Sequence, residues 1–150
     1  MHRAIDEYTD KHPKVLERKR QLYAKYHKYA AVIIDVFFDH VLAKNWKNYS
    51  PLSLSTFSSS CYTLLEAQQE ILPEQSRMIL FYMKRDDWLT NYATIEGMAK
   101  ALTGLSRRAR FDSKMDTSVD ELANNYEVYE SSFMEFFPDL YKFIQQNYSI

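Results

Sequence analysis

The sequence is short of the residues on which disulfide scaffolds and most sheet folds depend. It has 1 cysteine, 2 glycines and 4 prolines among 150 residues. One thiol cannot build an internal disulfide framework, and it agrees with a reducing compartment. So few glycines and prolines cannot supply the turns of a sandwich, a barrel or a doubly wound sheet. These shortages predict an all-α protein.

A long apolar run and a strong net charge are also missing. No apolar stretch reaches the roughly 18 residues of a membrane-spanning helix, and the start MHRAIDEYTD does not resemble a signal peptide. The formal net charge is −1 and the pI is about 6.4, so no overall field draws the chain to nucleic acid or to a membrane surface. We therefore expect a cytoplasmic protein with no nucleic-acid and no membrane partner.

What the sequence does contain favours one hydrophobic core. Hydrophobic residues make up 46% and aromatic residues 15% of the chain, which excludes a disordered protein. Apolar residues recur at helical spacing, and no repeat or linker interrupts residues 1–150. We expect a single-domain helical bundle over this whole range.

The run AAVIIDVFFDHVL at residues 30–42 is the most unusual stretch, because Asp35, Asp39 and His40 lie inside an apolar helix signal. Apolar side chains cover nearly its whole circumference, so we expect this helix to be buried. A dry carboxylate costs on the order of several kcal/mol and needs a shared proton, a cation or a metal ion. Two carboxylates one turn apart beside a histidine suit a divalent cation. The alternative is a buried hydrogen-bonded network without metal.

Further candidate ligands lie at the start of the chain. His2, Asp6 and Asp10 follow one another at intervals of four, which places at least the first two on one helix face. Such a face can present two ligands to one ion. The alternative is a frayed terminal turn in which Arg3 and Asp6 form a surface pair.

Three groups of cationic residues stand out. Arg107, Arg108 and Arg110 suit a phosphate or a carboxylate, and they equally suit a helix C-terminus, where cations complement the dipole. The clusters at 18–20 and 44–47 are either solvated faces or docking points for an acidic protein. Lys25, His27 and Lys28 follow the first of them and extend a local basic patch.

The remaining helix signals give testable expectations. We expect the helices at 52–72 and 73–82 to bury stripes that include Leu64 and Phe81. A helix at 116–136 should end at Pro138, before a short helix at 139–148.

Single residues add smaller expectations. His12 should be a solvated loop residue after a cap at Thr9 or Asp10. Gly97 should pack closely against a neighbour. The serines at 58–60 should form a polar helix face, because no Gly-x-Ser-x-Gly elbow surrounds them.

Four runs resemble the acyl carrier protein phosphodiesterase family. They are MHRAIDEYTDKHP at 1–13, IIDVFFDHVLAKNW at 33–46, MKRDDWLTNY at 83–92 and GLSRRAR at 104–110. The resemblance implies a fold similar to the helical HD phosphohydrolases and a metal-dependent phosphodiester hydrolase. It implies that the partner is acyl carrier protein, that 4′-phosphopantetheine is released, and that the metal is manganese, with magnesium as an alternative.

The same resemblance implies roles for particular residues. The proposed metal ligands are His2, Asp35, Asp39 and His40. The proposed catalytic residues are Asp6, which would orient a ligand or act on water, and Arg3, which would face the phosphate. The proposed phosphate-binding residues are Arg107 and Arg108.

One departure from the family pattern gives an alternative. Family members begin upstream of the first of these runs, so we expect this chain to be truncated at its N-terminus relative to them. A truncated or degenerate member could bind acyl carrier protein without catalysis. A homodimer is a further alternative, because the face left bare by the missing segment should be apolar.

Overall fold

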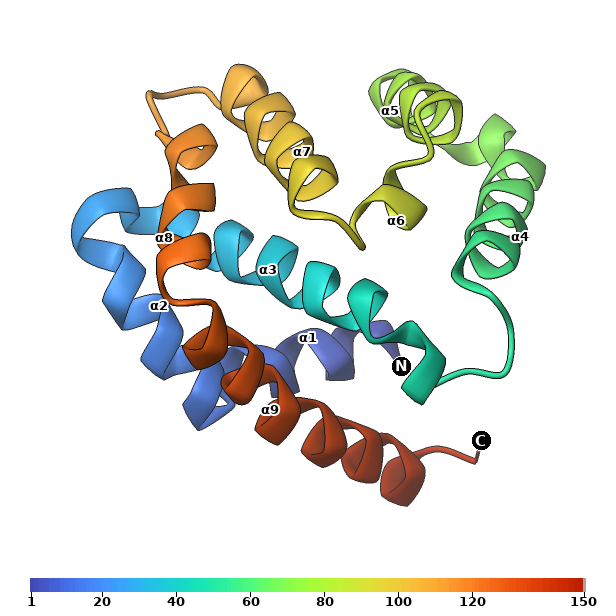
Figure 1. Cartoon of the computed structure of the whole chain (residues 1–150). Helices are drawn as coiled ribbons and strands as arrows, with labels where there is room; N and C mark the ends of the chain where they lie inside the picture. The colour runs from blue at the N-terminus through green and yellow to red at the C-terminus, as the bar shows by residue number, and fades with distance from the viewer. Residues whose placement is uncertain (150) are drawn as a thin grey trace. The chain divides into compact units, whose positions relative to one another are not determined.

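The computed structural model describes residues 1–149, and Figure 1 shows their course. Every regular element in this range is an α-helix or a short 3-10 helix. The predicted all-α fold is therefore confirmed. None of the helices in this range has the length and the apolar character that a bilayer crossing requires.

The chain forms two compact units. The first unit comprises Met1–Phe38 and the part of the chain that begins at Leu102, and the second comprises Asp39–Ala101. Helix α3, at Ala30–Lys44, begins in the first unit and ends in the second. Helix α7, at Ile95–Arg108, runs from the second unit back into the first.

Four whole helices belong to the first unit. They are α1 at His2–Lys11, α2 at Pro13–Tyr26, α8 at Ser118–Asn124 and α9 at Tyr126–Asn147. Helix α9 contacts α1, α2 and α8, and α1 contacts α2 (Figure 1). Short 3-10 turns at His27–Tyr29 and Met115–Thr117 precede α3 and α8.

The core of the first unit is aliphatic and aromatic. Phe37 meets Tyr129 edge-on with the ring centroids 5.1 Å apart, and Phe38 meets Phe133 in the same way at 5.5 Å. Each such pair adds about 0.5–1.5 kcal/mol beyond the area that it buries. The core also contains these buried residues: Val15, Leu22, Ile33, Ile34, Leu102, Leu122 and Phe136.

His12 is buried, so the expectation of a solvated loop residue and of a cap at Thr9 or Asp10 was wrong. His12 is itself the N-cap of α2, and its Nδ1 accepts a hydrogen bond from the Lys14 N–H at 3.2 Å. Its Nε2 lies 3.2 Å from Asp139 Oδ2. The residue before a proline favours the extended conformation that an N-cap requires, which explains why the cap falls directly before Pro13.

Helix α9 runs through Pro138, so the expected break at this proline was wrong. The helix begins instead after Asn125, whose N–H bonds to Glu121 O at 3.2 Å and closes α8. A proline removes one helical hydrogen bond, and Pro138 is exposed, where the helix can adjust. Buried side chains on both sides of it, Phe133 and Ile144, hold the helix on the core.

The second unit contains α4 at Leu54–Ala67, α5 at Glu74–Arg85 and α6 at Trp88–Asn91. Short 3-10 turns at Trp46–Asn48 and Gln69–Ile71 flank α4. Helix α4 contacts both α5 and α6 (Figure 1).

Two contacts fix the turn around α6. The Tyr62 hydroxyl donates to Asp87 Oδ1 at 3.0 Å and accepts from the Leu89 N–H at 2.9 Å. A Cβ placed on Gly97 would lie 1.9 Å from Asn91 O. The predicted close packing of Gly97 is therefore confirmed.

The apolar stripes of α4 and α5 lie largely outside the core, contrary to our expectation. Leu64 is 67% exposed and Phe81 is 62% exposed. Helix α4 buries Ser58 and Tyr62 instead, and Ser58 Oγ accepts from Thr90 Oγ1 at 3.0 Å. Buried polar groups with hydrogen-bond partners can replace an apolar stripe, and apolar spacing alone does not reveal such a replacement.

Candidate functional site

The carboxylate of Asp35 lies within electrostatic range of two others in the first unit. Asp35 of α3 interacts electrostatically with Asp6 and Asp10 of α1 and with Lys19 of α2. Lys19 Nζ also lies 2.7 Å from Asp10 Oδ1. We call these four residues the Asp35 cluster. It contains two residues of the run at 1–13, Asp6 and Asp10, and one residue of the run at 33–46, Asp35.

The pKa of Asp35 is raised to about 6. Loss of hydration is the largest cause, Lys19 lowers the pKa, and Asp10 and Asp6 raise it. The carboxyl group is therefore partly shielded from water. The residue as a whole is exposed, so the carboxyl group can still be reached from solvent. An accessible carboxyl group with a pKa near neutrality can accept a proton or bind a cation.

Asp35 and Asp39 are both exposed, which corrects the expectation of dry carboxylates. They lie four residues apart on α3, so they share one helix face, and that face is open. The apolar side chains beside them, such as Phe37, occupy the other faces. The alternative of a metal-free hydrogen-bonded network required both aspartates to be buried, and they are not.

His40, in the second unit, is buried, and its Nδ1 lies 2.7 Å from Tyr92 O. A carbonyl oxygen only accepts, so the neutral ring carries its proton on Nδ1 and Nε2 is the acceptor nitrogen. This is the tautomer in which histidine binds metal ions through Nε2.

The other predicted site residues lie at helix ends in the first unit. His2 and Arg3 are exposed in the first turn of α1. Arg107 and Arg108 are exposed in the last turn of α7, where cations also complement the helix dipole. A Cβ on Gly104 would lie 3.5 Å from Arg108 Nη2, so the guanidinium folds back along its own helix.

Asp6 and Lys19 thus lie within electrostatic range of Asp35, and sequence reasoning had treated Lys19 as part of a solvated face. The roles that the resemblance implies for Asp6 and Asp35 stay predictions. Asp39 and His40 belong to the second unit. Among residues 1–149, no three His, Cys, Asp or Glu side chains form a group that could hold a metal ion. The donor types fit a divalent cation, but these residues do not by themselves form a complete ligand set.

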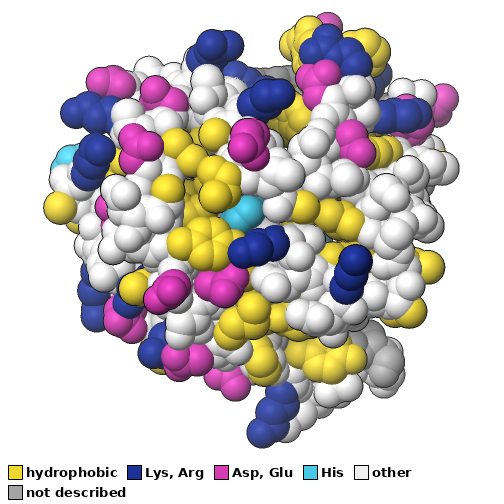
Figure 2. All heavy atoms as spheres, viewed as in Figure 1, with side chains coloured by type: hydrophobic (Ala, Val, Ile, Leu, Met, Phe, Trp, Pro, Cys, Tyr) yellow, Lys and Arg dark blue, Asp and Glu magenta, His cyan; other side chains and the backbone are white. Residues whose placement is uncertain are grey.

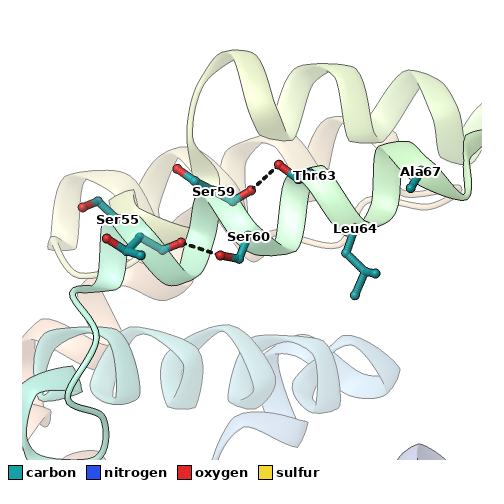
Figure 3. A pocket seen from close by; sticks show the side chains of 7 residues that line it. Ser55, Ser59, Ser60, Thr63, Leu64 and Ala67 are labelled. Carbon is teal, nitrogen blue, oxygen red and sulfur yellow. Dashed lines mark hydrogen bonds between the residues drawn. The ribbon is translucent and has the colours of Figure 1, made fainter.

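The serine-rich face of α4 lines a shallow pocket of about 720 Å³ (Figure 3). Ser60 Oγ donates to Thr56 O and Thr63 Oγ1 donates to Ser59 O, both at 3.0 Å. No titratable residue lines the pocket within the described chain. A polar helix face was expected here and is found at Ser59 and Ser60, whereas Ser58 points into the unit and is buried.

The fold and these side chains define an all-helical protein with a carboxylate cluster in one unit and a buried histidine in the other. A family model described as "Acyl carrier protein phosphodiesterase" matches residues 1–140. The chain belongs to the acyl carrier protein phosphodiesterase family.

Relatives in three bacteria carry the name acyl carrier protein phosphodiesterase. The protein of Escherichia coli is 32% identical over 143 residues, which cover 92% of this chain and 72% of the relative. That of Photorhabdus laumondii is 29% identical over 139 residues, covering 92% and 70%. That of Serratia proteamaculans is 26% identical over 141 residues, covering 93% and 73%. No solved structure gives a significant match to the chain.

Proposed function

We propose that this chain hydrolyses the phosphodiester of holo acyl carrier protein and releases 4′-phosphopantetheine. The observation that carries the proposal is the family match over residues 1–140, which includes the whole Asp35 cluster. The names of the relatives favour a hydrolase over the alternative of a protein that binds acyl carrier protein without catalysis.

The residues of the first unit suit a phosphodiester substrate. In this proposal Asp6 orients a ligand or accepts a proton from the attacking water, beside the partly shielded carboxyl group of Asp35. Arg3, Arg107 and Arg108 offset the negative charge of the phosphate through charge-assisted hydrogen bonds. Fold-back of Arg108 over Gly104 leaves its guanidinium at the protein surface.

A divalent cation, manganese or magnesium, is part of the proposal. Its proposed ligands are His2, Asp35, Asp39 and His40. The raised pKa of Asp35 and the Nε2 acceptor of His40 are the observations that support a cation. When bound, such a cation would lower the pKa of a water molecule and polarise a phosphoryl oxygen.

The proposal also covers the cellular compartment and the partners of the protein. The protein acts in the cytoplasm, as the single cysteine suggested, and it requires neither nucleic acid nor a membrane.

A homodimer is proposed on a different observation, namely the exposed apolar side chains Leu64, Ile71 and Phe81 of the second unit. Sedimentation over a range of concentrations tests it, and a constant monomer mass would remove it.

The experiment is release of phosphopantetheine from holo acyl carrier protein, with added manganese, with magnesium and with a chelator. We expect turnover with a metal and about 100-fold less after Asp35→Asn. Asp120→Asn, which changes an exposed aspartate outside the cluster, is the matched control and should keep full turnover. Full turnover by Asp35→Asn, or none by the unaltered chain with any metal, would overturn the proposal.

A further inference from the structure

A second pocket lies in the first unit, away from the Asp35 cluster in sequence. It has a volume of about 370 Å³ and is formed by the end of α2, the turn at His27–Tyr29 and the loop after α7. Aromatic and cationic side chains dominate its lining. They are Tyr23, Lys25, Tyr26, His27, Lys28, Tyr29, Phe111 and Lys114.

The cations around this pocket are exposed and not neutralised. Lys25, Lys28, Arg110 and Lys114 are all exposed. Within residues 1–149, no salt bridge joins any of them to an acid. Asp112 is the acidic residue of the described lining. The formal charge of the whole chain is −1, so this concentration of positive charge is a local feature, which we call the cationic patch.

Aromatic rings hold these cations in place. Lys28 Nζ lies 4.4 Å from the centroid of Phe111, and Arg110 Cζ lies 5.6 Å from the same ring. Lys25 Nζ lies 5.3 Å from the centroid of Tyr26. Tyr26 is buried, and its hydroxyl lies 3.0 Å from Thr117 Oγ1. The cationic patch therefore has a buried, hydrogen-bonded ring at its base and exposed ammonium groups above it.

Phe111 is 58% exposed although cations lie close to its ring. Aromatic side chains and arginine are enriched at protein interfaces, and Phe111 and Arg110 place one of each at this surface. Figure 2 shows Lys and Arg side chains at the left of the view, with Asp and Glu side chains and a few apolar ones among them.

The structure reduces the docking cluster expected at 18–20 to Arg20. Arg18 is buried, bonds to Gln21 Oε1 at 2.8 Å and pairs with Glu17. Lys19 is engaged by Asp10. Arg20 stays exposed on α2, and the cations of the cationic patch follow it along the chain.

We infer that the cationic patch docks an acidic surface of a partner protein, with an apolar side chain of the partner on Phe111. The inference rests on the proposed function, in which the substrate is itself a protein. Exposed ammonium groups on flexible stems suit several carboxylates spread over a surface better than one small anion, which needs buried donors. The negative total charge disfavours nucleic acid as the occupant.

The test measures binding of apo acyl carrier protein, which lacks the phosphopantetheine arm and cannot be hydrolysed. Titration calorimetry at several NaCl concentrations compares the unaltered chain with Lys28→Glu/Lys114→Glu. Lys11→Glu/Lys142→Glu is the matched control, because it changes two exposed lysines of the same unit by the same total charge. We expect about tenfold weaker binding and a smaller salt dependence for the patch variant. The control should stay within about twofold.

Each other outcome has a defined meaning. Equal weakening in both double variants, or affinity that does not depend on salt, overturns the inference. Self-association that the patch variant abolishes would assign the surface to a second copy of the chain and also overturns it. If the patch variant does not fold by circular dichroism, the salt dependence of the unaltered chain and binding by Phe111→Ala decide. Binding without turnover of holo protein would reject the proposed function alone.

Discussion

Replacing Asp35 with asparagine should stabilise the metal-free protein at pH 7. The pKa of Asp35 is about 6 in the folded chain against an ordinary 3.8, so the folded state holds this proton more tightly than the unfolded chain does. The unfolded chain releases the proton first as pH rises, and stability therefore falls between about pH 4 and pH 6. Asparagine has no proton to lose and avoids this decrease.

The magnitude follows from the shift and the exposure. A shift of about 2 pKa units corresponds to about 3 kcal/mol for a dry group. The Asp35 side chain reaches solvent, and screening reduces the expected gain to about 1 kcal/mol. For a chain of this size, that raises Tm by about 2–4 °C.

The assay is urea or thermal unfolding in the presence of a chelator, at pH 7 and at pH 3.5, for the unaltered chain and for Asp35→Asn. The gain should be present at pH 7 and nearly absent at pH 3.5, where the carboxyl group is mostly protonated in both states. Asp112→Asn, at another exposed aspartate, controls for the loss of one charge. A gain that is independent of pH, or a loss of stability at pH 7, would refute the reasoning.

Three further substitutions test the packing. Gly97→Ala should destabilise the chain by about 1–3 kcal/mol in denaturant unfolding, because its Cβ would overlap Asn91 O; a gain would show that the turn can move. Tyr62→Phe should cost about 1–3 kcal/mol, since Asp87 and the Leu89 N–H lose a partner; an unchanged urea midpoint would argue against both bonds. Pro138→Ala should stabilise α9 by about 1 kcal/mol and raise Tm in calorimetry, whereas a lower Tm would mean that the proline stabilises the helix at this position.

The all-α fold could be predicted because it depends on properties that act locally. Scarce glycine and proline exclude most turns, and apolar spacing marks helices such as the one that begins at Ile95. Gly97 was also predictable, since a glycine inside a helix is unfavourable unless a neighbour is close. Such features can be predicted without knowing which helices pack against each other.

The side that a helix buries could not be predicted where polar groups replaced apolar ones. Helix α4 has a clear apolar stripe, but Ser58 and Tyr62 are buried through hydrogen bonds to residues about 30 positions away in sequence. His12 was misassigned for a similar reason, because its partner Asp139 lies at the far end of the chain. Sequence spacing carries no information about such distant pairs.

The candidate site was predicted in part. Asp6 and Asp35 were singled out from spacing, burial reasoning and the family resemblance, and Asp6 lies close enough to raise the pKa of Asp35. Their proposed roles stay predictions. Lys19 was missed, because its pairing with Asp10 depends on how α1 and α2 fold against each other after Pro13. The spacing of residues within α1 or within α2 does not indicate how the two helices pack against each other.

The ion pair between Lys19 and Asp10 lets residues of two other helices change the pKa of Asp35. Asp10 raises the pKa of Asp35 directly, and it also binds the ammonium group that lowers it. A substitution at either surface position would therefore change the pH at which Asp35 loses its proton while leaving α3 untouched. Residues of α1 and α2 thus set the protonation state of a carboxyl group on a third helix.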